Sequence, residues 1–430
     1  MTSKDTYDNC LQTMYGLRRF GIKLGLSTIR EILAGLGNPQ RRFKCIHVAG
    51  TNGKGSIASS LASILHASGY NVGLYTSPHL VRFNERICIN NRPIPNENVV
   101  KAHKAIQSVH HGNRQPTFFE FATAMALYEF GRQQIDWAVI ETGMGGRLDA
   151  TNVIKPSLAI ITNISLEHRM YLGNTIGEIA AEKGGIIKRH CPVVTGARQK
   201  TAISVLEKLA RMKSAPMYRL GKDFRVRRNH TGTFTYFGIK NVWRKLRTEL
   251  LGDHQVDNAA LVLAASEVLN NKHVQISLQN VRDGLKKTAW PGRLEIVANS
   301  PLIILDGAHN LAAAQKLAQY LSTNLKGRKL TFVIGILDDK PYQAMLRSLL
   351  PVCNRVIITR SRIDRALSPE ILRRTAQKFV TDIKIIPDVD SAVKYAVDTT
   401  PPEDAICVAG SLYVVGEAKE FFEKQGMDFS

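Results

Sequence analysis

Ile46-His47-Val48-Ala49-Gly50-Thr51-Asn52-Gly53-Lys54-Gly55-Ser56-Ile57-Ala58-Ser59 is the stretch of this sequence that decides the fold. An apolar run leads into three glycines within six residues, and small and apolar residues follow at helical spacing. This order predicts a strand, a tight loop and a helix, the arrangement of a phosphate-binding loop. The glycines can turn successive N–H groups toward an anion, and Lys54 adds a positive charge where the helix begins.

The loop departs from the usual Walker A pattern, in which Ser or Thr directly follows the lysine and holds Mg²⁺. Here Gly55 intervenes and Ser56 comes one residue later, so we look for the metal ligands elsewhere. Ser77 follows a strand predicted over 71–75, and ligands collect outside the carboxyl ends of parallel strands. The alternative reading of Ser77 is a turn serine before proline.

Glu141 is the second candidate metal ligand, because it directly follows a strand predicted over 137–140. A carboxylate at the end of a buried strand, in a protein with a phosphate-binding loop, is the expected holder of Mg²⁺. A further strand, predicted over 157–164, leads into Glu167 and His168. Lys183 lies in the last turn of a predicted helix. The plain interpretation of Lys183 is a cation that opposes the helix dipole at that end.

Length and composition indicate a globular protein of two or three domains. The chain has 430 residues, of which 44% are hydrophobic and 22% charged. It begins without an apolar leader, and no apolar run approaches the roughly 20 residues that a membrane span needs. The six cysteines are scattered without a Cys-x-x-Cys pair, as reduced core thiols are. We therefore expect a cytoplasmic protein with no membrane partner.

The net charge of +22 leaves several partners open. It suits nucleic acid, a polyanionic small substrate together with ATP, or merely a basic proteome. The cations are spread along the chain, and local clusters such as Arg225, Arg227 and Arg228 are more often solvated surface than a binding groove.

The C-terminal third alternates strands with helices. Trp290-Pro291-Gly292 breaks any helix and marks the expected domain boundary. Strands are expected over 302–305, 330–334, 355–359, 383–386 and 405–409, and helices over 311–324, 341–350, 369–379 and 389–397. The sequence therefore predicts an α/β protein, with a P-loop ATPase-like parallel-sheet domain over 1–292 and a smaller Rossmann-like α/β domain over 293–430.

Eight blocks of the sequence, in order, resemble the folylpolyglutamate synthase/dihydrofolate synthase branch of the Mur ligase family. They cover nearly the whole chain, at 50–56, 76–80, 141–152, 182–186, 252–260, 290–295, 305–310 and 410–413. The resemblance implies an ATP-dependent amide ligase. A substrate carboxylate attacks the γ-phosphate of ATP, and the amino group of L-glutamate then displaces phosphate from the acyl phosphate. Dihydropteroate and tetrahydrofolate are the implied acceptors, and we expect a monomer that binds no nucleic acid.

The resemblance also carries roles onto this sequence. The catalytic residues would be Lys54, His168 and Lys183. Ser77, Glu141 and His168 would hold one Mg²⁺, and a carbamylated Lys183 would help hold a second; the resemblance also allows for a monovalent cation such as K⁺. ATP would contact Thr51, Asn52, Gly53, Lys54, Gly55, Ser56, Asn258, Arg293, Asp306 and His309. Pteroate or folate would contact Leu24, Gly25, Leu26, Thr117, Phe118, Phe119, Glu120, Leu148, Asp149 and Ala150.

Aromatic rings suit a pterin that stacks, and Asp149 could accept hydrogen bonds from pterin nitrogens. For Glu120, which stands among aromatic residues, the plain alternative is the edge of an amphipathic helix. Two positions depart from the family pattern. Glu167 stands where Asp is common, and Lys23 stands where bifunctional enzymes often carry Asp, which puts the use of dihydropteroate in question.

Three alternative functions agree with parts of this sequence. A monofunctional folylpolyglutamate synthase would lack the dihydropteroate reaction. A peptidoglycan-type Mur ligase would carry a nucleotide-sugar domain before the loop, where this sequence has about 45 residues. A nucleic-acid-binding P-loop ATPase would suit the charge, but it leaves Glu141, His168 and Asp306 without a reason.

Overall fold

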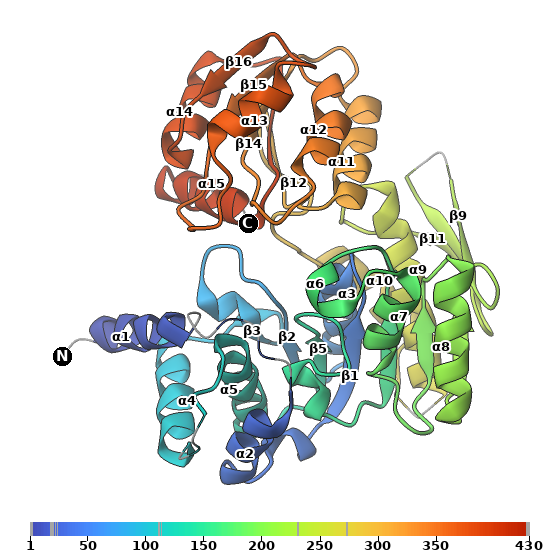
Figure 1. Ribbon diagram of the computed structural model, residues 1–430. Helices are drawn as coiled ribbons and strands as arrows, with labels where there is room; N and C mark the ends of the chain where they lie inside the picture. Colours follow the sequence, from blue (N-terminus) through green and yellow to red (C-terminus); the bar gives the residue numbers. More distant parts are fainter. Residues whose placement is uncertain are drawn as a thin grey trace. The chain divides into compact units, whose positions relative to one another are not determined.

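The computed structural model describes residues 3–17, 21, 23, 25–110, 112, 114–229, 232–271 and 274–426. This described chain forms two compact units, one of residues 1–249 with 255–289 and the other of residues 250–254 with 290–430. Each unit combines a mostly parallel sheet with helices (Figure 1). The predicted α/β class is therefore confirmed. No helix among the described residues is long and apolar enough to cross a bilayer.

In the described residues, the larger unit is built on an eight-stranded sheet. In spatial order the strands are β4 (Arg92–Pro93), β3 (Ile87–Ile89), β2 (Val72–Tyr75), β5 (Trp137–Glu141), β1 (Lys44–Ala49), β6 (Leu158–Ile161), β7 (Val193–Thr195) and β8 (Met217–Arg219). From β2 to β8 all neighbours are parallel, while β3 and β4 form an antiparallel edge. The carboxyl ends of β2, β5, β1 and β6 consequently meet at one edge of the sheet.

Helices cover both faces of this sheet because its strands are apolar on both sides. The described helices are α1 (Ser3–Gly16), α2 (Ser27–Gly35), α3 (Lys54–Ala67), α4 (Asn96–Val109), α5 (Phe118–Arg132), α6 (Arg169–Leu172), α7 (Ile176–Gly184), α8 (Lys200–Met212), α9 (Asp253–Asn270) and α10 (Leu278–Lys287). Along β1, Ile46 and Val48 belong to the core with α3, α9 and α10, whereas Cys45 belongs to the core with α2, α4 and α5. β1 therefore lies in the middle of the unit.

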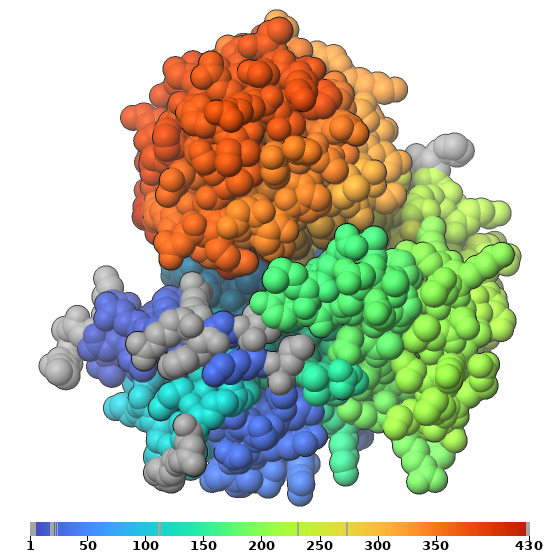
Figure 2. All heavy atoms as spheres, in the orientation of Figure 1, coloured from blue at the N-terminus to red at the C-terminus, as the bar shows by residue number. Residues whose placement is uncertain are grey.

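A small antiparallel sheet packs on the core of α3 and α9. Its strands are β9 (Arg225–Arg228), β10 (Phe234–Phe237) and β11 (Val242–Leu246). Phe234, Tyr236 and Leu246 are buried in that core, and Arg225 and Arg227 are exposed. Figure 2 shows the side chains of the 200–250 segment, in yellow-green, on the outer surface of this unit.

In the described residues, the smaller unit has a six-stranded sheet. In spatial order the strands are β12 (Glu295–Asn299), β13 (Leu302–Asp306), β17 (Ala405–Ala409), β14 (Leu330–Ile334), β15 (Arg355–Ile358) and β16 (Asp382–Ile385). The helices are α11 (Leu311–Asn324), α12 (Tyr342–Leu349), α13 (Pro369–Ala376), α14 (Val389–Thr399) and α15 (Leu412–Lys424). All strand pairs are parallel except β12 with β13, which is antiparallel. The edge strand β12 was not among the strands expected from the sequence.

Candidate nucleotide and metal site

The phosphate-binding loop follows β1 and ends at Gly53, the N-cap of α3. Gly50 has a φ of 147°, and a Cβ there would lie 1.9 Å from Thr162 Oγ1. Gly53 has a φ of 82°. Both angles are ones that residues with a side chain rarely adopt. The loop therefore presents the N-terminus of α3, where a helix favours an anion, and the predicted strand, loop and helix are confirmed.

We expect Gly50→Ala to destabilise the larger unit by about 1–3 kcal/mol, because the added methyl group meets both a strained φ and Thr162. Urea unfolding followed by circular dichroism measures this loss. Gly177→Ala is the matched control: that glycine lies in α7 without a positive φ, and its nearest neighbour would be 3.5 Å from the new Cβ. Equal stability of the two variants would contradict the assigned loop geometry.

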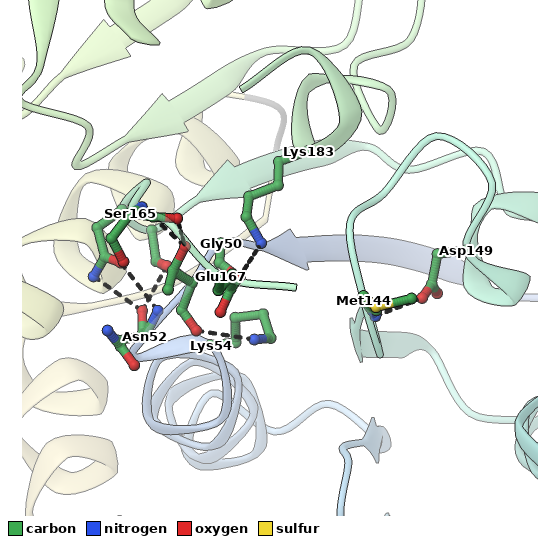
Figure 3. A network of polar contacts seen from close by, with 11 residues as sticks. Gly50, Asn52, Lys54, Met144, Asp149, Ser165, Glu167 and Lys183 are labelled. Carbon is green, nitrogen blue, oxygen red and sulfur yellow. Dashed lines mark hydrogen bonds and ion pairs between the residues drawn. The ribbon is translucent and has the colours of Figure 1, made fainter. Parts of the chain in front are cut away.

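The segment that follows β6 holds this loop in place. The Thr51 N–H donates to the Asn163 carbonyl at 2.9 Å, the Asn52 N–H donates to Asn163 Oδ1 at 3.0 Å, and the Ser165 N–H donates to Thr51 Oγ1 at 3.0 Å. Figure 3 shows this network around Asn52 and Ser165. Asn163 was not among the predicted site residues, although its position just beyond a buried strand was a signal.

Lys54 and Asn258, both assigned to ATP by resemblance, lie at the same loop. Lys54 Nζ donates to the carbonyl of Thr51 at 3.2 Å. Asn258, on α9, is the group that a Cβ on Gly53 would meet at 2.7 Å, and Gln255 of the same helix donates to Ser56 Oγ at 3.4 Å. The loop and α9 thus bring the predicted ATP residues of this unit together.

Ser77 and Glu141 meet at the shared edge of the sheet. The Ser77 N–H donates to Glu141 Oε2 at 3.1 Å, and Glu141 pairs in register with Val48, two residues before Gly50. Glu141 is 4% exposed. Carboxylate and hydroxyl oxygens are donor types that Mg²⁺ accepts, so the chemistry of Glu141 and Ser77 fits the ion.

His168 lies at the N-cap of α6 with a φ of 44°, directly after Glu167. No group of three or more His, Cys, Asp or Glu side chains in the described residues is arranged to hold a metal ion. The predicted set of Ser77, Glu141, His168 and Lys183 contains only two such residues, so it depends on the serine hydroxyl and on a modified lysine. It stays a prediction.

Lys183 is the most buried charged group of the site, at 1% exposure in the last turn of α7. Its Nζ donates to the Gly50 carbonyl at 2.8 Å and to Glu167 Oε1 at 2.5 Å (Figure 3). Burial above all lowers the pKa of Lys183 to about 8, Lys54 adds to this, and Glu167 opposes it. The amine is therefore deprotonated far more often at neutral pH than an ordinary lysine.

The contact of Glu167 with Lys183 was not predicted from the sequence. Burial works against its charge, but Lys183 and Lys54 together hold its pKa below the usual value. A carboxylate directly after a strand that ends beside the phosphate loop was the available signal. Glu167 now stands as the counter-charge of the two lysines.

The predicted folate contacts at the start of α5 have two different structural roles: Phe118 and Phe119 contact other aromatic rings, and Thr117 and Glu120 cap the helix. The ring of Phe118 lies 5.7 Å from that of Tyr15, and the ring of Phe119 lies 6.1 Å from that of Tyr75. Glu120 accepts from the Thr117 N–H at 2.8 Å as part of a capping box. It also accepts from Arg114 Nη2 at 2.5 Å. Capping explains why Glu120 and Thr117 stand among aromatic residues.

Asp149 organises the loop after Glu141. It is 5% exposed, and it accepts from the N–H of Met144 at 2.8 Å and of Thr151 at 3.0 Å. Burial raises the pKa of Asp149, and these hydrogen bonds oppose the rise. Both carboxylate oxygens are thus used inside the protein. Leu148 and Ala150 flank Asp149, Gly25 and Leu26 directly precede α2, and Leu24 lies outside the described residues.

The other predicted ATP residues form a cluster within the smaller unit. Asp306, at the end of β13, accepts from the N–H of Leu294 and of Ala308, each at 2.9 Å. Arg293 Nη1 donates to the Gly307 carbonyl at 2.9 Å, and His309 Nδ1 lies 2.8 Å from the same oxygen. Burial raises the pKa of Asp306, and Arg293 opposes the rise.

Two domain families match this chain and define its class. The Mur ligase middle domain matches residues 48–266, and the Mur ligase glutamate ligase domain matches residues 292–412. The chain belongs to the Mur ligase family and, within it, to the dihydrofolate synthase/folylpolyglutamate synthase branch.

Relatives span more than nine tenths of the chain. It is 36% identical to the dihydrofolate synthase/folylpolyglutamate synthase of Bacillus subtilis, over 96% of this chain and 98% of that protein. It is 36% identical to the folylpolyglutamate synthase of Lacticaseibacillus casei, over 91% and 93%. The structure of Escherichia coli FolC in complex with DHPP and ADP matches with a TM-score of 0.90 at 30% identity, covering 97% of this chain and 98% of that one. The Mycobacterium tuberculosis folylpolyglutamate synthase complexed with ADP matches with a TM-score of 0.91 at 32% identity, over 98% and 99%.

Proposed function

We propose that this chain is an ATP-dependent ligase that joins L-glutamate to a folate carboxylate and to dihydropteroate, releasing ADP and phosphate. The observation that carries the proposal is the convergence at one sheet edge of the Lys54 loop, the Ser77–Glu141 pair and the Lys183–Glu167 pair. Relatives named for these two activities support it, as do matching structures with ADP and DHPP. We place the reaction in the cytoplasm and expect a monomer that binds no nucleic acid.

Two steps account for the residues present. A carboxylate oxygen of the folate attacks the γ-phosphorus while the bond to ADP breaks, which leaves an acyl phosphate. The glutamate amine then attacks the acyl carbon, the bond to phosphate breaks, and the amine loses a proton. Lys54, released from the Thr51 carbonyl, would place its ammonium on the transferring phosphoryl group. Bound Mg²⁺ would neutralise phosphate charge.

We assign one Mg²⁺ to Ser77, Glu141 and His168, and a second to the carbamate of Lys183. Carbamylation joins the neutral Lys183 amine to CO₂ with loss of a proton, and it replaces a cation by an oxygen anion. The resulting repulsion would release Glu167 from its ion pair. We also propose that the enzyme uses a monovalent cation such as K⁺. Measuring its activity with Na⁺ in place of K⁺ tests this.

The proposal divides the chemistry between residues 1–292, which carry the ATP loop and the folate contacts, and residues 293–430, the glutamate-ligase part. The family matches to 48–266 and 292–412 support this division. Of the remaining ATP contacts that the resemblance implies, Asn258 belongs to the first part, and Arg293, Asp306 and His309 belong to the second.

We expect the purified protein, given ATP and L-glutamate, to extend tetrahydrofolate and also to convert dihydropteroate. Mass spectrometry of the products and coupled ADP release measure both reactions. If tetrahydrofolate is extended and dihydropteroate is not converted, the enzyme is restricted to chain extension. Lys23 would suggest this outcome, because it stands where bifunctional enzymes often carry Asp. Product from neither acceptor would contradict the proposed function.

A further inference from the structure

A chain of hydrogen bonds crosses from the core of the sheet to the loop after Glu141. His47, in the middle of β1, is fully buried, and its Nε2 lies 2.8 Å from Thr151 Oγ1. The Thr151 hydroxyl donates to Asp149 Oδ1, and Asp149 Oδ2 accepts from the Met144 N–H at 2.8 Å. Figure 3 shows this last contact. Three side chains thus connect the strand before the phosphate loop to the backbone of another loop.

The chemistry of the three side chains determines which group donates in each of these hydrogen bonds. An ionised Asp149 only accepts, so the Thr151 proton points to it, and the Thr151 oxygen must accept from a proton on His47 Nε2. Burial above all, with a contribution from Lys188, lowers the pKa of His47 to about 3, so the imidazole is a neutral donor. Its Nδ1 is buried with no partner in the described part of the chain, a cost that an apolar residue in this strand would avoid.

The loop at the end of the chain of hydrogen bonds touches two parts of the site. Gly143 lies under the ring of Phe119, since a Cβ there would come within 2.5 Å of Phe119 Cζ. The Arg147 N–H donates to the Glu182 carbonyl at 2.8 Å, next to Lys183 on α7. The position of residues 143–149 therefore sets the position of the surface beside Phe119.

We propose that His47 and Thr151 are positioning residues for the folate substrate. Acting through Asp149, they hold the 143–149 loop against Phe119 in the conformation that receives the aromatic ring system of the substrate. This inference rests on the proposed function. It requires no contact between His47 and the substrate, because His47 is buried in the sheet.

The test is Thr151→Val, which removes the hydroxyl at nearly constant shape, against Thr151→Ser, which keeps it. In steady-state assays with tetrahydrofolate we expect Thr151→Val to raise the KM for the folate about tenfold and to leave the KM for ATP within about twofold. Thr151→Ser should stay within about twofold of the unmodified protein for both. Thr195→Val is the matched control, because Thr195 is equally buried and its hydroxyl donates to the Ile161 carbonyl between β7 and β6, not to Asp149.

His47→Phe provides an independent variant, and combined with Thr151→Val it should raise the folate KM no further than the stronger single change. Additive effects, an unchanged folate KM in Thr151→Val, or an equal rise in Thr195→Val would each overturn the inference. So would a Thr151→Val effect confined to the melting temperature. An unmodified protein that is inactive with every folate would instead contradict the proposed function.

Discussion

Lys54→Ala should lower kcat for ADP formation by about 10³-fold or more, the largest loss expected at any single position. Lys54 is the first residue of α3, directly after the Gly53 N-cap. Its ammonium would neutralise charge on the transferring phosphoryl group, and removal of one such group typically costs 10²–10³ in kcat, with more when the full charge is lost. Coupled ADP release with saturating ATP, glutamate and tetrahydrofolate measures the effect.

Lys44→Ala is the matched control for this variant. Lys44 begins the same strand, β1, at its opposite end, where its Nζ lies 5.4 Å from the ring of Trp137. We expect its kcat to stay within about twofold, because a surface charge so placed contributes little. Near-normal turnover in Lys54→Ala, with an unchanged melting temperature, would show that another group neutralises the phosphate and would remove Lys54 from the catalytic residues.

The sequence predicted the elements whose pattern is local. β1, Gly53 and α3 follow the predicted strand, loop and helix, and α11 has the predicted bounds, 311–324. Apolar runs, glycines and helical periodicity determine these elements without help from distant residues.

The antiparallel strand β12 shows what local pattern cannot predict. It is an edge strand without a fully buried residue, and Ile296 and Asn299 are exposed, so its short apolar run does not have the burial pattern of a core strand. Its conformation depends on pairing with β13, a partner that the sequence alone does not identify. The short helix α10 was likewise not predicted, although local signals were present: Ser277 caps it, and Val281, Gly284 and Leu285 form a buried face at helical spacing.

Candidate site residues divide in the same way. Ser77 and Glu141 were predicted from the sequence because each follows an apolar run that marks a strand. The structure joins them through one hydrogen bond. The sequence could not locate the partners that geometry alone assigns. Glu167 pairs with Lys183 across 16 residues, and His47 reaches Thr151 across 104. Neither pair has a sequence pattern, since each depends on how β1, β6 and α7 pack.

Lys183→Ala should lower kcat by about 10²–10³-fold, and short carboxylates such as acetate or propionate should restore part of it. The carbamate proposed at Lys183 would supply oxygen atoms to a metal ion, and a small carboxylate can enter the space that the shortened side chain leaves. Lys183→Arg is the matched variant: it keeps a cation but forms no stable carbamate, so it should be inactive and should not respond to carboxylates.

The pH dependence follows from the pKa of about 8 at Lys183. Roughly a quarter of the amine is neutral at pH 7.5, against roughly one part in a thousand for a lysine of ordinary pKa. Because only the neutral amine takes up CO₂, the carbamate fraction of Lys183 should fall as the pH drops from 8 to 6. At pH 8, added bicarbonate should raise this fraction. Carbon-13 NMR of protein equilibrated with labelled bicarbonate should show one carbamate signal that Lys183→Ala lacks. A fully active enzyme without that signal would assign Lys183 to its ion pair with Glu167 alone.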